Sequence, residues 1–188
     1  HIRSHYNKPT YKYFYGSLDG AFHSISIYYS ITPDEHIGVE QTHTIIIPSS
    51  IIKPAYEWND PNQPTIKKLN LTGNYSKPIC LAGQDIVLES CNNYANYNLL
   101  DCGQDTYIIF FTPFGYNLHE LNNCKNYGNI SCVGKTYSTK SGLIRADIIN
   151  SCVNYGNIDS GTTLCFGIYG GSVLNSINYG NIIGTDIS

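Results

Sequence analysis

The chain has 188 residues, of which 41% are apolar and 13% charged, and it carries a formal net charge of −3. The apolar fraction is large enough to build a core, which argues against disorder. The absence of a Lys/Arg patch argues against nucleic acid as a partner. No apolar run approaches the ~18 residues of a membrane span, so no membrane insertion is expected. Abundant Tyr and Ile favour strands, whereas Asn and Gly favour turns, and together they predict a turn-rich all-β protein.

The first predicted elements lie in the N-terminal third of the chain. The sequence begins HIRSHY without a Met, which predicts an internal or processed start. Residues 13–30 contain YFYGSLDGAFHSISIYY, with strand-forming residues around a Gly/Asp turn. Residues 32–64 contain the strand-like stretch HTIIIPSSII between Pro-rich edges, which predicts an irregular coil or a long loop.

Residues 65–188 carry a repeat built around the pentapeptide N-Y-G-N-I. Three good copies are anchored at Tyr127, Tyr155 and Tyr179. A degenerate copy has Tyr94 at the anchor, and in a weaker one Gly73-Asn74-Tyr75 fill the G-N-I slots. The copies are spaced about 22 to 33 residues apart, which is the range for one coil of a solenoid.

Stacked coils lie ~4.8 Å apart, so equivalent residues should form columns. We expect ladders of Asn and Tyr side chains and an interior column of Ile, formed by Asn126, Asn154 and Asn178, by Tyr127, Tyr155 and Tyr179, and by Ile130, Ile158 and Ile182. The Gly of each pentapeptide is expected to supply a positive φ at a turn. Upstream, Ala82, Gly115 and Gly167 form a small-residue column, and Gly142 lies one position off, which predicts a one-residue insertion.

The seven cysteines form no C-x-x-C pair and have no His at metal spacing, so a zinc site is not expected. Cys91, Cys124 and Cys152 share one repeat position with Ser176, and they are expected to be free, stacked thiols in the interior. The other cysteines are the disulfide candidates, with their pairing left open: Cys80, Cys102, Cys132 and Cys165.

Residues 13–30 resemble the F-x-G-x-[LF]-D-G-x-G-H-x-I motif of extracellular GLUG-repeat β-helix proteins, and the matching residues are Gly16, Leu18, Asp19, Gly20, His23 and Ile25. The second family Gly is replaced by Ala21 or Phe22, a departure that is expected to alter this turn. The N-C-x-N-Y-G-N-I copies resemble the coils of that family, so the resemblance covers residues 13–30 and 65–188. It implies a right-handed parallel β-helix in secreted or surface proteins of bacteria and protists. Such repeats are usually passive stalks or adhesive surfaces.

Candidate sites in the sequence are few. Three N-x-[ST] sequons mark glycosylation candidates at Asn70, Asn74 and Asn129. The acids that could share one face of successive coils are Glu89, Glu120 and Asp147, with His119 and Arg145 nearby, and a solvated face is favoured over a catalytic one. Weaker candidates are a metal site at Asp34, His36 and His43 and a sugar platform at Tyr56 and Trp58, whereas His23 is expected to hydrogen-bond a turn. No cofactor is expected.

The sequence therefore predicts a single β-helix segment, residues 1–188, of about five to seven coils and belonging to a longer protein. The expected function is that of an extracellular or cell-surface structural and adhesive protein rather than an enzyme. Open strand edges invite end-to-end assembly with another copy, or with flanking domains of the same chain. The alternatives are a carbohydrate-binding or polysaccharide-cleaving β-helix module, with glycans as partners, and a non-catalytic segment of a larger secreted protein.

Overall fold

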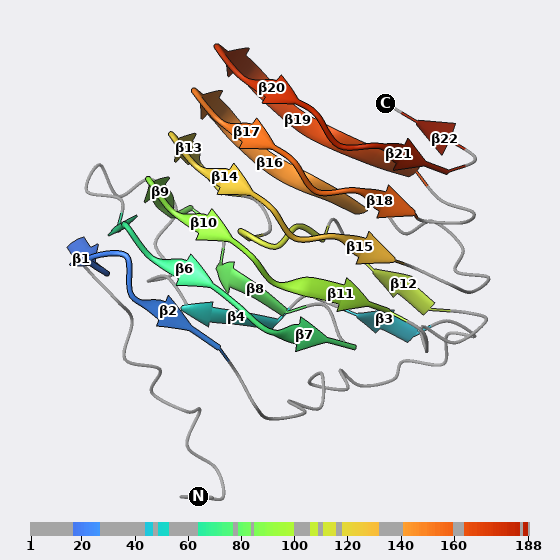
Figure 1. Ribbon diagram of the computed structural model, residues 1–188, viewed down its shortest axis with the longest axis horizontal. Helices are drawn as coiled ribbons and strands as arrows, with labels where there is room; N and C mark the ends of the chain where they lie inside the picture. The colour runs from blue at the N-terminus through green and yellow to red at the C-terminus, as the bar shows by residue number, and fades with distance from the viewer. Residues whose placement is uncertain are drawn as a thin grey trace, which may run out of the picture.

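The computed structural model describes residues 17–26, 44–46, 49–52, 64–76, 79–83, 85–99, 106–108, 111–115, 118–131, 141–159, 164–184 and 186–187. These residues form strands and turns and contain no helix, which confirms the all-β prediction. The successive repeats run from one end of the molecule to the other, and in Figure 1 the colour passes broadly from blue to red along this direction.

Three parallel sheets contain most of the strands. The seven-stranded sheet has the spatial order β1 (Ser17–Asp19), β5 (Thr65–Lys67), β9 (Val87–Glu89), β13 (Glu120–Asn122), β16 (Ser141–Asn150), β19 (Leu164–Leu174) and β22 (Asp186–Ile187). The six-stranded sheet contains β2 (Ser24–Ile25), β6 (Asn70–Leu71), β10 (Asn92–Asn93), β14 (Lys125–Asn126), β17 (Val153–Asn154) and β20 (Ile177–Asn178). The five-stranded sheet contains β7 (Asn74–Tyr75), β11 (Asn96–Asn98), β15 (Ile130–Ser131), β18 (Ile158–Asp159) and β21 (Ile182–Ile183).

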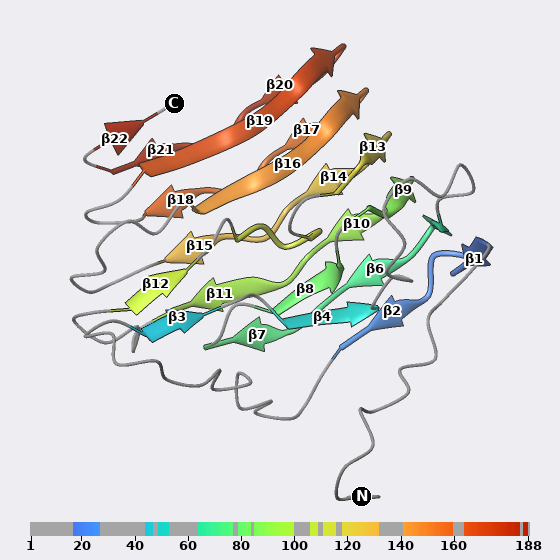
Figure 2. The ribbon, with the colours of Figure 1, turned by 180° about the vertical axis from the view of Figure 1, so that it is seen from behind.

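The chain visits the three sheets in turn and then returns beside its starting strand. Strands β9, β10 and β11 each join a different sheet, and β13, β14 and β15 lie beside them in the same order (Figure 1). The register pairs Leu88 with Leu121, Asn93 with Asn126, and Tyr97 with Ile130. From behind, Figure 2 shows the long strands β16 and β19 of the seven-stranded sheet in front. This parallel stacking is consistent with a β-solenoid.

Two short parallel pairs complete the described strands. Strand β3 (Thr44–Ile46) pairs with β12 (Thr106–Ile108), and β4 (Ser49–Ile52) pairs with β8 (Ile79–Ala82). Strands β3 and β4 both belong to the segment 32–64, so part of that segment is paired with strands of the repeat region. Ala82 also bridges Gly115, in the small-residue column read from the sequence.

The core consists of side-chain columns that run along the stack. In the seven-stranded sheet one fully buried column contains Ile66, Leu88, Leu121 and Ile149. Full burial of such a side chain stabilises the fold by roughly 1.5–3 kcal/mol. Leu18 and Val173 extend this column at its two ends, where they are 37% and 44% exposed.

A left-handed turn joins the seven-stranded sheet to the six-stranded sheet in every repeat. The residue immediately before the Cys position has a φ between 49° and 56°, and it is Lys68, Ser90, Asn123, Ser151 or Asn175. None of these is a glycine. Two of them are Asn, which tolerates this conformation better than most residues.

The glycines of N-Y-G-N-I have a different role from the predicted one. Among the described glycines only Gly73 has a positive φ, so the prediction for Gly128, Gly156 and Gly180 is wrong. A Cβ at Gly128 would lie 1.8 Å from the Ala95 carbonyl oxygen, and one at Gly156 would lie 1.9 Å from the Gly128 oxygen. Glycine is required because successive backbones touch at this corner.

The predicted one-residue insertion near Gly142 is also wrong. Strands β16 and β19 keep one register from Ser141–Cys165 to Asn150–Leu174, and Gly142 pairs with Phe166. A Cβ at Gly142 would meet the Phe166 ring at 1.8 Å, so this glycine makes room for the ring. The apparent shift therefore reflects a local packing requirement.

Candidate functional site

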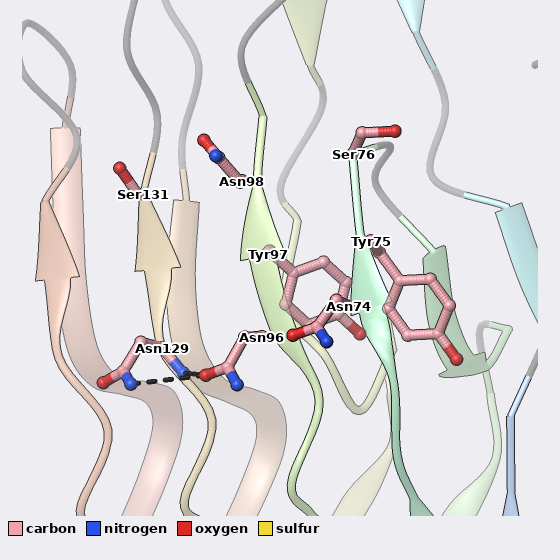
Figure 3. A pocket seen from close by; sticks show the side chains of 8 residues that line it. All are labelled: Asn74, Tyr75, Ser76, Asn96, Tyr97, Asn98, Asn129 and Ser131. Atoms are coloured by element: carbon pink, nitrogen blue, oxygen red, sulfur yellow. Dashed lines mark hydrogen bonds between the residues drawn. The ribbon is translucent and has the colours of Figure 1, made fainter.

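A hollow of about 470 Å³ lies over the five-stranded sheet, where β7, β11 and β15 are neighbours. It is lined by Asn74, Tyr75, Ser76, Asn96, Tyr97, Asn98, Asn129 and Ser131 (Figure 3). Side chains alternate along these short strands, so the asparagines are exposed while the two tyrosines between them are buried.

Two buried tyrosines also line the hollow, in the column that Ile occupies in later repeats. The ring centroids of Tyr75 and Tyr97 lie 5.3 Å apart, and Figure 3 shows both rings on the same side of their strands. Both hydroxyls donate to backbone oxygens, Tyr75 to Thr72 at 2.8 Å and Tyr97 to Ile79 at 2.7 Å. These hydroxyls are occupied within the protein, which leaves the rim to contact a ligand.

The rim presents side-chain amides to solvent. Asn96 Oδ1 accepts hydrogen bonds from the backbone N–H of Asn129 at 3.0 Å and from Asn129 Nδ2 at 3.3 Å. Within the described part of the chain, the amides of Asn74 and Asn98 make no hydrogen bond. An amide offers two donors and one acceptor oxygen, which is the chemistry that binds sugar hydroxyls.

A second exposed feature is a stack of tyrosine rings at the corner between the six-stranded and five-stranded sheets. Tyr94 and Tyr127 have centroids 4.9 Å apart and planes 1° apart, and Tyr127 and Tyr155 follow at 5.0 Å and 9°. Tyr179 continues the stack from Tyr155 at 5.5 Å and 13°. All four side chains are exposed, so the stack forms a continuous aromatic strip on the surface.

A ladder of asparagines runs beside this strip, and three of its four members, Asn93, Asn126 and Asn154, are fully buried. Asn93 Nδ2 donates to Asn126 Oδ1 at 2.7 Å, Asn126 Nδ2 donates to Asn154 Oδ1 at 2.7 Å, and Asn154 Nδ2 donates to Asn178 Oδ1 at 2.5 Å. Each amide also donates to the carbonyl oxygen two residues further on. The amides of the ladder hydrogen-bond to one another and to the nearby backbone, as in a structural element.

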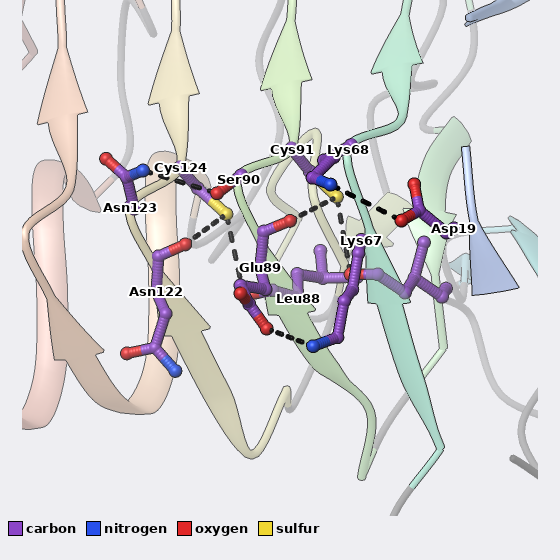
Figure 4. Close-up of polar contacts among 11 residues, drawn as sticks. Asp19, Lys67, Lys68, Leu88, Glu89, Ser90, Cys91, Asn122, Asn123 and Cys124 are labelled. Atoms are coloured by element: carbon purple, nitrogen blue, oxygen red, sulfur yellow. Dashed lines mark hydrogen bonds and ion pairs between the residues drawn. The ribbon is translucent and has the colours of Figure 1, made fainter. Parts of the chain in front are cut away.

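The cysteine column is enclosed in the same interior. Cys91, Cys124 and Cys152 are free thiols with no exposed surface, and each donates to backbone oxygens at 3.3 to 3.6 Å (Figure 4 shows the first two). Burial raises the pKa of Cys124 well above 9.0, and the neighbouring thiols of Cys152 and Cys91 raise it further. In the last repeat Ser176 donates to the Leu174 oxygen at 2.8 Å, as the thiols do.

The disulfide candidates are only partly described. The buried thiol of Cys80 lies 3.3 Å from the Ala82 oxygen, and that of Cys165 lies 3.8 Å from the Ile183 oxygen. Cys102 and Cys132 lie outside the described residues. The proposed disulfides therefore stay a prediction.

The candidate carboxylates have different partners. Glu89 pairs with Lys67 at 2.8 Å (Figure 4), and Glu120 lies in another column, between Val87 and Ile148. Asp147 Oδ2 lies 3.9 Å from His119 Nδ1. Within the described residues no ion pair or hydrogen bond joins the three acids to one another.

Asp85 was not among the sequence candidates, although it lies near this group. Partial burial raises the pKa of Asp85, and the charge of Asp147 raises it further, whereas His119 lowers it. Burial also lowers the pKa of the Arg145 guanidinium. Asp85, His119 and Asp147 precede or belong to three successive strands of one sheet, so only the fold brings them together.

The three sequons differ in their surroundings. Asn70 Nδ2 donates to the Phe22 oxygen at 2.7 Å, and Asn70 Oδ1 accepts from Asn92 at 2.9 Å. Asn74 and Asn129 are exposed, and both lie on the rim of the hollow together with the Ser of their own sequon. Glycosylation at all three stays a prediction.

Several remaining candidates fall outside the described residues, namely Gly16, Asp34, His36, His43, Tyr56 and Trp58. His23 is exposed, and its backbone carbonyl accepts from the Asn70 N–H at 3.0 Å. In the part of the chain that the structure describes, no three His, Cys, Asp or Glu side chains gather closely enough to hold a metal ion. That part also contains no helix with the length and hydropathy of a membrane span.

No family model, curated protein or solved structure matches this sequence.

Proposed function

We propose that the chain is a scaffold segment of an extracellular or cell-surface structural and adhesive protein, wound as a right-handed β-helix of about five to seven coils. The observation that carries this proposal is the asparagine ladder from Asn93 to Asn178, buried except at Asn178, beside the exposed tyrosine stack. Buried amides in an active site are aimed at a substrate, whereas these amides bond to one another along the stack. The repeat thus builds a stiff body and displays regular columns on its surface.

The proposed partner is a second copy of the chain, stacked end to end, or a flanking part of the same polypeptide. At one end of the stack Val173 on β19, Ile177 on β20 and Tyr179 just after β20 are exposed, and at the other end Leu18 is exposed on β1. Leu18 and Val173 belong to the same inward column, so stacking β1 on β19 would continue that column. Unpaired strand edges favour this kind of addition.

The assembly is tested by sedimentation velocity over a range of concentrations, together with electron microscopy. We expect growing oligomers or filaments, and we expect Val173→Lys or Ile177→Lys to abolish them because a charge would enter the joint. Asp159→Lys is the matched control, since Asp159 lies on β18 within the stack. Compact monomers at every concentration would overturn self-assembly and leave the flanking polypeptide as the partner.

The location is tested separately in the organism that makes the protein. Antibody labelling of intact, unpermeabilised cells, compared with permeabilised cells, reports whether the chain faces the outside. Labelling that appears only after permeabilisation would contradict the extracellular proposal.

Glycan binding is the second candidate function, and the amide-lined hollow over β7, β11 and β15 favours it. Binding to pectin, alginate and host glycans is measured by calorimetry, with product analysis for cleavage. Asn74→Ala and Asn98→Ala should each weaken binding severalfold without loss of stability, because their amides make no hydrogen bond to the described residues. Asn181→Ala, exposed but remote from the hollow, is the control.

A further inference from the structure

The exposed tyrosine stack brings phenol rings into contact where an external oxidant can reach them. Tyr127 and Tyr155 form its central pair, with ring centroids 5.0 Å apart and planes 9° apart. Their side chains are 40% and 45% exposed. Tyr94 and Tyr179 extend the stack on either side with similar geometry.

We propose that this stack is a site of oxidative crosslinking, in which Tyr127 and Tyr155 are joined as dityrosine by a peroxidase that uses hydrogen peroxide. Each phenol loses one electron and its hydroxyl proton and becomes a phenoxyl radical. The two radicals form a C–C bond between ring carbons ortho to the oxygens, and the two displaced ring hydrogens return to the oxygens as protons. The peroxide O–O bond breaks, and the two electrons and two protons reduce it to two water molecules.

The fold favours coupling within one molecule over coupling between molecules. Two groups held in contact react as if present at very high concentration, because folding has already supplied the translational entropy needed to bring them together. The rings lie on the outside of the corner, so they can tilt to bring their ortho carbons together without displacing the core. Gly128 and Gly156, which follow the two tyrosines, keep the successive backbones in contact.

A second tyrosine pair in the same protein provides an internal comparison. Tyr75 and Tyr97 are separated by 5.3 Å, close to the spacing of the exposed pair. They are buried, and both hydroxyls donate to backbone oxygens. A peroxidase cannot reach these phenols, so proximity alone should not make them react.

The dityrosine bond would link two successive repeats covalently. Tyr127 follows β14 and Tyr155 follows β17, and these two strands are paired in the six-stranded sheet. A crosslink between them closes a loop of the chain and restricts the unfolded state, as a disulfide does. This inference is independent of the proposed function, since it needs only the ring geometry and an oxidant.

The test treats the purified chain with horseradish peroxidase and hydrogen peroxide, then reads dityrosine fluorescence and maps crosslinked peptides by tandem mass spectrometry. We expect a peptide with Tyr127 linked to one with Tyr155, at a mass two hydrogens below their sum, in a product that runs as a monomer. Tyr127→Phe and Tyr155→Phe should each remove this species. The double Phe variant leaves Tyr94 and Tyr179 apart, so its dityrosine fluorescence should fall severalfold. The thermal unfolding midpoint of the crosslinked wild type should rise above that of the untreated protein.

The matched control is Tyr169→Phe. Tyr169 is as exposed as the stack, but it packs against Phe166 rather than against another tyrosine. This variant should give the wild-type yield, and urea-unfolded wild type should lose the Tyr127–Tyr155 species. Crosslinks found only between molecules, an equal yield from unfolded protein, or an unchanged yield in the double Phe variant would overturn the proposal. Phe keeps a ring in each position, and circular dichroism checks that each variant is folded.

Discussion

Asn126 donates through Nδ2 to Asn154 Oδ1 at 2.7 Å, and neither side chain has any exposed surface. The same Nδ2 also donates to the Gly128 oxygen, and Asn126 Oδ1 accepts from Asn93. A single asparagine is therefore hydrogen-bonded both to the turn of its own repeat and to the two neighbouring repeats. Removing its amide breaks three buried hydrogen bonds, to Asn93, to Asn154 and to the Gly128 oxygen.

We expect Asn126→Ala to lower the free energy of unfolding by about 3 kcal/mol, since it removes three buried hydrogen bonds that each contribute ~1 kcal/mol. Urea denaturation followed by circular dichroism measures the loss. Asn181→Ala removes an exposed amide from the same turn of a later repeat, and it should change stability by less than about 0.5 kcal/mol. Equal losses in the two variants would show that the buried ladder has no special role.

The sequence carries the periodicity of this fold directly, because parallel stacking places one residue type in one column. The weak copy ending in Tyr75 is assigned correctly, since Tyr75 pairs with Tyr97 and Tyr97 with Ile130. These glycines are required by a close backbone approach rather than by a positive φ, and that approach depends on the neighbouring repeat. A single repeat read alone contains no trace of it.

That close approach makes glycine irreplaceable at the centre of the stack. We expect Gly156→Ala to destabilise the fold by at least about 3 kcal/mol, because its Cβ would lie 1.9 Å from the Gly128 oxygen and force the two backbones apart. Gly171→Ala is the control, since a Cβ there would lie 3.1 Å from the Asp147 oxygen. Thermal unfolding compares the two, and similar midpoints would contradict this account of the motif.

The N-terminal turn is strained at Ala21 and Phe22. Ala21 and Phe22 have φ values of 45° and 60°, in the region that favours glycine. The left-handed conformation costs a non-glycine residue ~1–2 kcal/mol. A substitution by glycine relieves this strain, but the larger conformational entropy of glycine in the unfolded state offsets part of the stabilisation.

Phe22→Gly should therefore stabilise the protein by about 0.5 kcal/mol. The Phe22 side chain is 55% exposed, so its removal costs little packing. Leu18→Gly, in the adjacent strand β1, should instead destabilise the protein by about 1 kcal/mol, since glycine weakens a strand. Denaturant midpoints for the two variants should move in opposite directions, and a shared decrease would contradict the strain argument.

The hollow could not be predicted in the way that the columns were. Its rim combines Asn74, Asn96 and Asn129 from three repeats that are separated by two different loop lengths. The available signal was the substitution of Tyr75 and Tyr97 for the usual Ile in two consecutive repeats. A hollow between repeats depends on how the side chains pack, and packing cannot be derived from the repeat pattern.

Cys124, at the centre of the cysteine column, predicts a loss of stability in alkali, whereas hydrogen bonds with Cys124 lower the pKa of Cys91 and of Cys152. Burial raises the pKa of Cys124 well above 9.0, so the folded protein keeps this thiol neutral at a pH where the unfolded chain ionises it. A raised pKa contributes stability that is fully present below the unfolded value. That stability is lost as the pH rises through 9.0 toward the folded value.

Cys124→Ser tests this dependence with a residue that the last repeat already uses in the same column, at Ser176. The serine hydroxyl does not titrate in this range, so above pH 9 the wild type should lose stability more steeply than the variant, by up to about 1.4 kcal/mol per pH unit. Below about pH 8 the two curves should run parallel. Ser176→Ala leaves the titrating thiols in place and should keep the wild-type slope. Urea unfolding at a series of pH values gives the slopes, and equal slopes for wild type and Cys124→Ser above pH 9 would show that the thiol titrates alike in the folded and unfolded chain.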